Sequence, residues 1–254
     1  PNAHPDAVSV RARVLRAQDR VSDVIVRGRT EALRRVDMRA EIEGRVVELP
    51  KERGNLRAGG KLQAMVVDGI ADTRNWNAPT MPVQQLYEVR WVDLENVEAP
   101  QDDLRMRAAA KGAAIVARGE GIHMGTDELY VCSTSGGNRR LGQIFKLIPG
   151  RGRRPDMVEL FFESESEDQF NFGDNLTVAP NGHLIVCEDQ YTDVVDNHLR
   201  GITPDGRAYA FGRLTMQTEL AGGCFSPDGK WFFVNAYSPT RTVAITGPWD
   251  RFVA

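Results

Sequence analysis

The chain has 254 residues, of which 41% are hydrophobic, and a formal net charge of −3 with an isoelectric point of about 5.9. This apolar content is enough for a buried core, which excludes global disorder, and the lack of an overall positive field disfavours nucleic acid as a partner. No apolar run approaches the roughly 20 residues that cross a bilayer, and the sequence starts without the charged and then apolar pattern of a signal peptide. We therefore expect neither a membrane span nor a signal peptide in this chain.

Residues 1–60 differ in charge from the rest of the chain. They carry 13 Lys/Arg against 9 Asp/Glu, a local +4, which leaves −7 for the remainder. Short β-rich runs broken by glycine and by Pro50 predict a small β-segment here. The stretch "EALRRVDMRAEIEGRVVEL" resembles the periplasmic adaptor subunits of resistance-nodulation-division efflux pumps, over about residues 9–59. We therefore expect two domains, an adaptor-like segment over 1–60 and a second domain over 61–254.

Two short stretches follow. "DTRNWN" places Asp72, Arg74 and Trp76 together, which we interpret as an aromatic packed between sheets with polar neighbours. "APQDDLRMRAAAKGAAI" begins with Asp102 and Asp103, residues suited to a helix start, and predicts a short helix. Helix content elsewhere should be slight.

Three Pro-Asx-Gly turns dominate the second half of the chain, at residues 180–182, 204–206 and 227–229. Proline presets φ and glycine accepts a positive φ, so each turn should close a β-hairpin between flanking apolar runs. The first and third turns lie 47 residues apart with the second between them, which gives two hairpins per repeat. The sequence predicts an all-β fold, a partial β-propeller of about three four-stranded blades, and a β-sandwich remains the alternative.

Carboxylates recur at matching places in these repeats. The stretch "AIVARGEGIHMGTDELYVCST" contains Glu120, and Glu120, Asp174 and Glu219 are each expected just before the innermost strand of a blade. Glu188 is expected at the end of a second strand, which lies on the same face. Carboxylates that meet at one mouth repel one another unless a cation lies among them, and oxygen ligands favour Ca²⁺. Solvated acids on loops remain the alternative.

The remaining reactive side chains are expected to be structural. Cys132, Cys187 and Cys224 have no CxxC spacing and lie in apolar runs, which predicts buried thiols. His123 lies near the expected mouth, and we interpret it as a packed or surface histidine rather than a ligand.

Several motifs together carry a family resemblance. They are "LQAMVVDG", "DTRNW", "RWVDLENVEAPQDDLRMRAAAKGAAIVARGEGI", "DNLTVAPNGHLIVCED", "GGCFSPDGKWFFVN" and "AITGPWD". From about Leu62 to Phe252 the chain resembles the C-terminal part of PhoX-type alkaline phosphatases. The resemblance implies a six-bladed propeller that hydrolyses phosphate monoesters with calcium and iron in its central channel.

The same resemblance implies roles for individual residues. Arg118 would be the cation beside the phosphate, and Glu120 a metal ligand or catalytic carboxylate. Asp174, Glu188 and Glu219 would bind calcium or iron. An arginine fork suits a phosphoryl group, and metal ions stabilise both attacking and leaving oxygens. A structural ion pair of Arg118 with a neighbouring acid remains the alternative.

The sequence departs from this family in its first part. The N-terminal half of the family, with a cysteine ligand to iron, is replaced by the adaptor-like segment, so the chain looks like a fusion of two fragments. Three blades cannot close a ring, and open sheet edges favour a homodimer that completes it. We expect a metal-dependent phosphoric ester hydrolase, periplasmic or secreted. The alternatives are a calcium-dependent propeller hydrolase of phosphotriesters or lactones, and a non-catalytic binding or assembly fragment.

Overall fold

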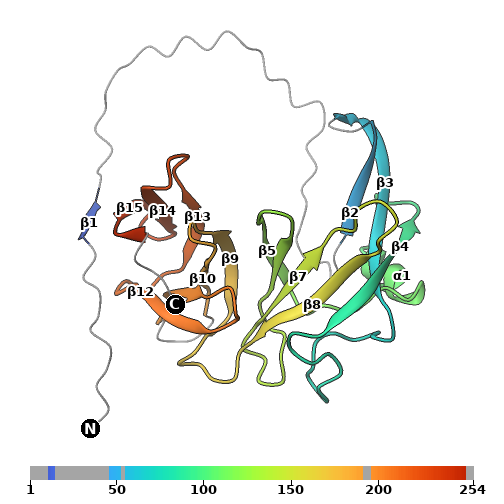
Figure 1. Ribbon diagram of the computed structural model, residues 1–254, viewed down its shortest axis with the longest axis horizontal. Coiled ribbons are helices and arrows are strands. Elements are labelled where there is room, and N and C mark those ends of the chain that lie inside the picture. Colours follow the sequence, from blue (N-terminus) through green and yellow to red (C-terminus); the bar gives the residue numbers. More distant parts are fainter. Residues whose placement is uncertain (1–10, 15–45, 53–54, 191–195, 250–254) are drawn as a thin grey trace.

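The computed structural model describes residues 11–14, 46–52, 55–190 and 196–249, and their regular secondary structure is almost entirely β (Figure 1). The strands are β1 (Arg11–Val14), β2 (Val46–Glu52), β3 (Asn55–Val67), β4 (Leu86–Leu94), β5 (Gly119–Met124), β6 (Leu129–Ser133), β7 (Gln143–Ile148), β8 (Asp156–Glu163), β9 (Gly173–Val178), β10 (Leu184–Glu188), β11 (His198–Ile202), β12 (Ala208–Arg213), β13 (Leu220–Phe225), β14 (Trp231–Ala236) and β15 (Arg241–Thr246). One helix, α1 (Leu104–Ala110), begins after Asp103, which confirms the helix prediction. Among the described residues no helix is long and apolar enough to cross a membrane.

These strands form three antiparallel sheets. Their strand orders are β12-β11-β10-β9, β1-β15-β14-β13 and β2-β3-β4-β8-β7-β6-β5. The first strands of the three repeats are neighbours, because β9 contacts both β5 and β13 (Figure 1). The all-β prediction is therefore confirmed, and the sheets form a partial, propeller-like arrangement.

The three predicted Pro-Asx-Gly turns are present. Gly182, Gly206 and Gly229 have φ values of 84°, 84° and 68°, where only glycine is unstrained. Each donates its N–H to the carbonyl three residues earlier, at 2.8 to 2.9 Å. The turns join β9 to β10, β11 to β12 and β13 to β14, and thereby set the register of all three hairpins.

The largest sheet extends beyond the repeat. β4 pairs with β8, and β3 and β2 continue the sheet outward. Met65 and Val67 of β3 pack with Phe145 and Leu160 of β7 and β8, so the added strands curl over one face of their own sheet. The expected domain boundary between residues 60 and 61 lies inside β3.

β10 shows how the sheets pack on one another. All five of its side chains are buried. Because alternate side chains of a strand point to opposite faces, Val186 packs with the β5–β8 side and Cys187 with Phe232 of β14. Each large aliphatic side chain buried this way contributes roughly 1.5–3 kcal/mol.

The cysteine prediction is confirmed at two of three positions. Cys132 and Cys187 are buried, whereas Cys224 is exposed. Cys224 pairs across the sheet with Phe233, on the face of β13 and β14 that points away from β10. Apolar flanking residues therefore did not identify which face of the strand the thiol would occupy.

Candidate functional site

The first strand of each repeat begins with the same irregularity. Pairing with the second strand shifts at 119–122, 173–176 and 221–224, so two residues oppose one in each case. These β-bulges place Glu120 and Asp174 at equivalent positions, as the first of the two unpaired residues. Bulges redirect side chains, and they are over-represented beside active sites.

This register corrects the sequence prediction. Glu120 and Asp174 are the second residues of β5 and β9, not the residues before them. Glu219 does lie just before β13, and the third bulge carries Gly222 where the other two carry an acid. The three carboxylates are therefore not strictly equivalent.

Arg118 precedes the first bulge in a left-handed conformation, with φ of 46°. Phe172 has φ of 53° before the second bulge, so the backbone enters β5 and β9 through the same kind of turn. Such a conformation costs of order 1 kcal/mol for a residue with a Cβ, and it is found at binding sites more often than elsewhere. The Arg118 carbonyl accepts a hydrogen bond from the Thr134 N–H at 3.0 Å, which fixes the turn at Arg118 against the end of β6.

The Arg118 side chain points along this turn toward Glu120. Nη2 lies 3.4 Å from Glu120 Oε1, and the Arg118 side chain is 39% exposed. The ion pair considered as an alternative is thus present. A guanidinium has five N–H donors in a fork, so this pairing is compatible with binding a phosphoryl group.

Four carboxylates influence one another here, and we call them the acid cluster: Glu120, Asp174, Asp189 and Glu219. Burial raises the pKa of Asp174 to about 6, and the charges of Glu120 and Asp189 add to this while Arg118 opposes it. Burial also raises the pKa of Glu219 to about 7, with a hydrogen bond to Asp189 and the charges of Asp189 and Asp174 as further causes. Burial, together with repulsion among the carboxylates, thus favours the protonated forms of Asp174 and Glu219.

Asp189 was not predicted. It follows the last residue of β10, is 8% exposed, and donates its N–H to the Phe172 carbonyl at 2.8 Å. The sequence signal was "CED", two adjacent acids at a strand end, of which only one can face the bulge.

Glu188, the acid that was predicted, lies elsewhere. It is fully buried and accepts hydrogen bonds from Arg200 Nε at 2.7 Å, the His198 N–H at 2.9 Å and the Asn171 N–H at 2.8 Å. The structure therefore brings together Glu120, Asp174 and Glu219, and places Glu188 in an ion pair behind them.

Gly121 allows β5 to approach β9 closely. A Cβ atom there would lie 2.4 Å from the Asp174 carbonyl oxygen and 2.8 Å from the Leu176 nitrogen, both backbone atoms that cannot move aside. We expect Gly121→Val to separate Glu120 from Asp174 and to cost about 1–3 kcal/mol of stability, measured by urea unfolding. Gly119→Ala is the matched control, because nothing lies within 4 Å of its Cβ. Equal stability of both variants would contradict the close approach.

The carboxylate oxygens of the acid cluster are ligands that a hard cation prefers, although the side chains are not close together. Among the described residues no three His, Cys, Asp or Glu side chains are gathered closely enough to hold a metal ion. The acid cluster nevertheless supplies only oxygen ligands, which Ca²⁺ prefers, and an excess of negative charge, which Ca²⁺ would neutralise. Burial raises the pKa of the Cys132 thiol well above its usual range and that of Cys187 to about 12, so both are neutral thiols in this structure.

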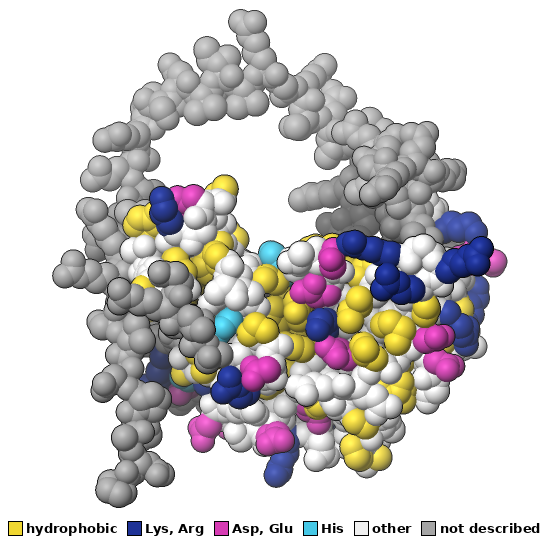
Figure 2. Space-filling model, viewed as in Figure 1, with side chains coloured by type: hydrophobic (Ala, Val, Ile, Leu, Met, Phe, Trp, Pro, Cys, Tyr) yellow, Lys and Arg dark blue, Asp and Glu magenta, His cyan; other side chains and the backbone are white. Residues whose placement is uncertain are grey.

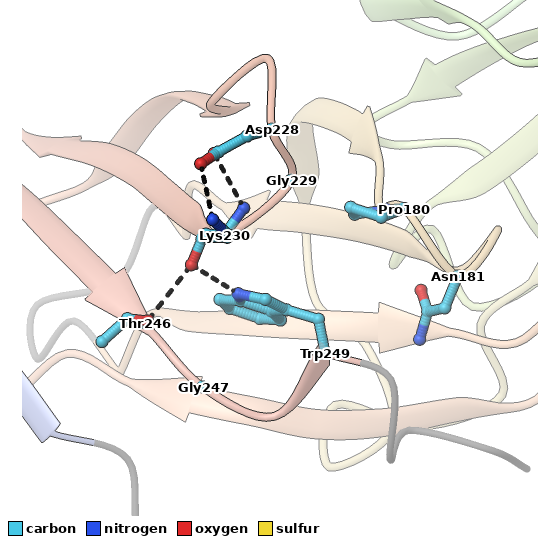
Figure 3. Close-up of a pocket in the computed structure, with 8 residues that line it drawn as sticks. All are labelled: Pro180, Asn181, Asp228, Gly229, Lys230, Thr246, Gly247 and Trp249. Carbon is cyan, nitrogen blue, oxygen red and sulfur yellow. Dashed lines mark hydrogen bonds and ion pairs between the residues drawn. The ribbon is translucent and has the colours of Figure 1, made fainter.

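A separate cavity of about 550 Å³ lies at the turns 180–182 and 227–229, at the far end of β9 and β13 (Figure 3). The Trp249 indole N–H donates to the Lys230 carbonyl at 2.8 Å, and Lys230 Nζ lies 3.5 Å from Asp228. A six-residue strand spans roughly 20 Å, which separates this cavity from the acid cluster. Its charged groups are paired with each other, so it does not offer the chemistry of the acid cluster.

Comparison with protein families gives one match. Residues 43–240 match the family model of alkaline phosphatase PhoX. The match begins inside the segment expected to be adaptor-like, and the comparisons give no support to an adaptor fragment. No curated protein matches the chain.

Among solved structures, the fold is similar to Pseudomonas fluorescens PhoX in complex with vanadate, a transition state analogue. The TM-score is 0.56 at 18% identity, covering 80% of this chain and 49% of that one, so this chain spans about half of the PhoX structure. Two gluconolactonases match less well: XC5397 from Xanthomonas campestris, with a TM-score of 0.39 at 12% identity over 74% of this chain and 54% of that one, and periplasmic PpgL from Pseudomonas aeruginosa, with 0.37 at 12% over 58% and 43%. The last two similarities are too low to support an argument.

Proposed function

Because the chain belongs to the alkaline phosphatase PhoX family, we propose that it is a metal-dependent hydrolase of phosphate monoesters that acts at the acid cluster. The observation that carries this proposal is the position of Arg118, turned by a left-handed φ beside Asp174 and Glu219, whose pKa values are raised by burial and by the charges of neighbouring acids. A cation fork next to uncompensated oxygen ligands is the arrangement that phosphoryl transfer requires.

Each residue has a role in this proposal. Arg118 binds the phosphoryl oxygens and stabilises their charge in the transition state. Glu120, Asp174, Asp189 and Glu219 would hold Ca²⁺, with Fe³⁺ as a second ion, and bound ions would polarise the phosphoryl group and the attacking water.

We assign Glu188 a positioning role in place of the predicted ligand role. Its contact with the Asn171 N–H holds the turn that leads into Asp174, and Asp189 follows it directly in the chain.

Two other chemistries remain in competition, and a substrate panel separates them. Calcium-dependent propeller hydrolases also act on phosphotriesters or lactones, and a binding fragment would act on neither. We expect the purified protein with calcium to release phosphate from p-nitrophenyl phosphate faster than it hydrolyses paraoxon or γ-butyrolactone. Faster turnover of the triester or lactone would contradict the proposal. No turnover, together with no bound metal by elemental analysis, would favour the binding fragment.

Metal binding should be visible in the pH dependence of stability. Both raised pKa values mean that the folded state binds more protons than the unfolded state, so this contribution is full below about pH 4 and is lost as pH rises through 6 to 7. In chelator we therefore expect the melting temperature to fall between pH 5 and pH 8, and added calcium to reduce that fall. Glu219→Gln should flatten the profile in chelator. An identical fall with and without calcium would contradict a cation at this cluster.

The partial ring leaves apolar side chains uncovered. Ile122 and Met124 of β5 are each 52% exposed, and Trp231 and Tyr237 on the β13–β15 sheet are 42% and 69% exposed. Hydrophobic side chains also reach the face seen in Figure 2, between groups of charged ones. We propose about three blades per chain, β5–β8, β9–β12 and β13–β15 with β1, and a homodimer in which a second copy supplies the other three.

Light scattering on a size-exclusion column tests this assembly. A homodimer has about twice the monomer mass of 28.2 kDa. The double variant Ile122→Glu with Met124→Lys should be monomeric, because it would place charges in the interface between the two copies. A monomeric wild-type protein at micromolar concentration would contradict the dimer. Neither Ile122 nor Met124 belongs to a core cluster, so these replacements should leave the fold of each copy intact.

We place the protein in the periplasm or outside the cell, with a small phosphate ester as substrate. The resemblance to PhoX-type enzymes supports this location. Oxygen-ligand calcium sites of modest affinity also suit compartments where calcium is abundant.

A further inference from the structure

The loop that joins β6 to β7 connects the acid cluster to a second cationic feature. At its start, the Thr134 N–H donates to the Arg118 carbonyl at 3.0 Å. At its end, the Leu141 carbonyl accepts the Phe172 N–H at 2.8 Å. The loop is therefore anchored on the two left-handed residues that lead into Glu120 and Asp174.

Trp76 is fixed to the same loop between two guanidinium groups. Its indole N–H donates to the Ser135 carbonyl at 2.8 Å, and the Gly137 N–H donates to the Arg74 carbonyl at 2.8 Å. The Arg74 and Arg140 guanidinium carbons lie 4.2 and 4.7 Å from the Trp76 ring centroid. Stacking of this kind holds a guanidinium in place without consuming its N–H donors.

The two stacked arginines differ in their ionic partners. Arg74 binds Asp72 through two hydrogen bonds, at 2.9 and 2.7 Å, and this contact lowers the pKa of Asp72. Arg140 is exposed, and in the described part of the chain neither it nor Arg139 forms an ion pair. Arg140 also has φ of 59°, so the loop carries a left-handed arginine, as does the turn at Arg118.

The neighbouring carboxylate does not neutralise this loop. Glu163 accepts hydrogen bonds from Asn75 Nδ2 at 2.7 Å, Gln143 Nε2 at 2.9 Å and the Asn138 N–H at 2.9 Å. These three bonds occupy both of its oxygens. The charge of Arg140 therefore remains available on the loop surface.

We propose that Arg140, held on the Trp76 ring, is a second anion subsite, and that the preferred substrates are phosphate esters whose leaving group carries another phosphate. This inference rests on the proposed function and specifies the substrate class of that site. The Arg118 fork takes the phosphoryl group that is transferred, and the Arg140 fork takes the one that is kept. A guanidinium already ordered by stacking loses less rotamer freedom on binding, which favours affinity.

Calorimetric titration with phosphonates tests the subsite without turnover, because their P–C bond is not cleaved by ester hydrolysis. Short α,ω-alkanediphosphonates are compared with alkylphosphonates of the same length, in calcium. We expect Arg140→Gln to weaken diphosphonate binding about tenfold and to leave alkylphosphonate binding within about twofold. Arg140→Lys should lie between, since it keeps the charge and loses the fork.

Arg153→Gln is the matched control, because it removes the same charge from the exposed loop between β7 and β8. Equal weakening by both variants, equal loss for both probes, or no diphosphonate binding by the wild type would overturn the subsite. Melting curves check that Arg140→Gln is folded. A protein that binds diphosphonates through Arg140 and releases no phosphate from monoesters would refute the proposed function alone.

Discussion

Replacing Arg118 with alanine is expected to lower kcat for a phosphate monoester by about 10²–10³-fold, the usual effect of removing one preorganised group that stabilises transition-state charge. The side chain is partly exposed and lies 3.4 Å from Glu120, so the fold should tolerate its loss. Steady-state kinetics with p-nitrophenyl phosphate measure the effect, and Arg118→Lys should recover part of the rate.

Two controls make this result specific. Arg153→Ala removes an arginine from the β7–β8 loop and should leave kcat unchanged. His123→Ala removes a ring that bonds Thr177 Oγ1 at 3.2 Å, and it should lower kcat less than Arg118→Ala does. An Arg118→Ala variant with wild-type kcat would remove Arg118 from the proposed site.

The second large effect concerns stability. Glu188→Ala should lower the free energy of unfolding by about 3–5 kcal/mol, because it leaves the Arg200 guanidinium buried without its carboxylate. Urea unfolding of the chelated protein measures this loss. If Glu188 were instead a calcium ligand, as the sequence predicted, the variant would keep its stability in chelator and lose only the stabilisation by calcium.

The paired replacement Glu188→Leu with Arg200→Met is the control. Removing both charges leaves no buried charge unpaired, so part of the stability should return, while the Asn171 and His198 N–H groups still lack their acceptor. A double variant as unstable as Glu188→Ala would show that the volume of the side chain, rather than the charge, determines the effect.

Local signals predicted most of the fold. The turns at 180–182, 204–206 and 227–229 are set by proline and glycine within three residues, and all three close hairpins as expected. The extension through β4 could not be predicted in the same way, because β4 pairs with β8 about 70 residues later in the chain. Hydrophobic alternation identifies a strand, but it does not say which distant strand lies beside it.

The residues of the candidate site were harder to predict from the sequence than the fold was. Glu120 and Asp174 were found because their repeats align, and the structure places them in equivalent bulges. Glu188 was predicted because it ends the second strand of its blade, whereas the structure couples Asp189, the next residue, to Asp174 and Glu219. A bulge adds one residue and reverses which side chains face the core, and nothing in the repeat spacing reveals it.

The proposed function requires that the acid cluster binds a cation on which phosphate ester hydrolysis depends. Its most direct test is phosphate release from p-nitrophenyl phosphate by protein stripped with chelator and then reloaded with calcium, for wild type, Asp189→Asn and the distant control Asp228→Asn. We predict that stripping abolishes activity, that calcium restores it in wild type and Asp228→Asn, and that Asp189→Asn needs at least about tenfold more calcium. Activity that survives stripping, or the same calcium dependence in all three proteins, would contradict the claim.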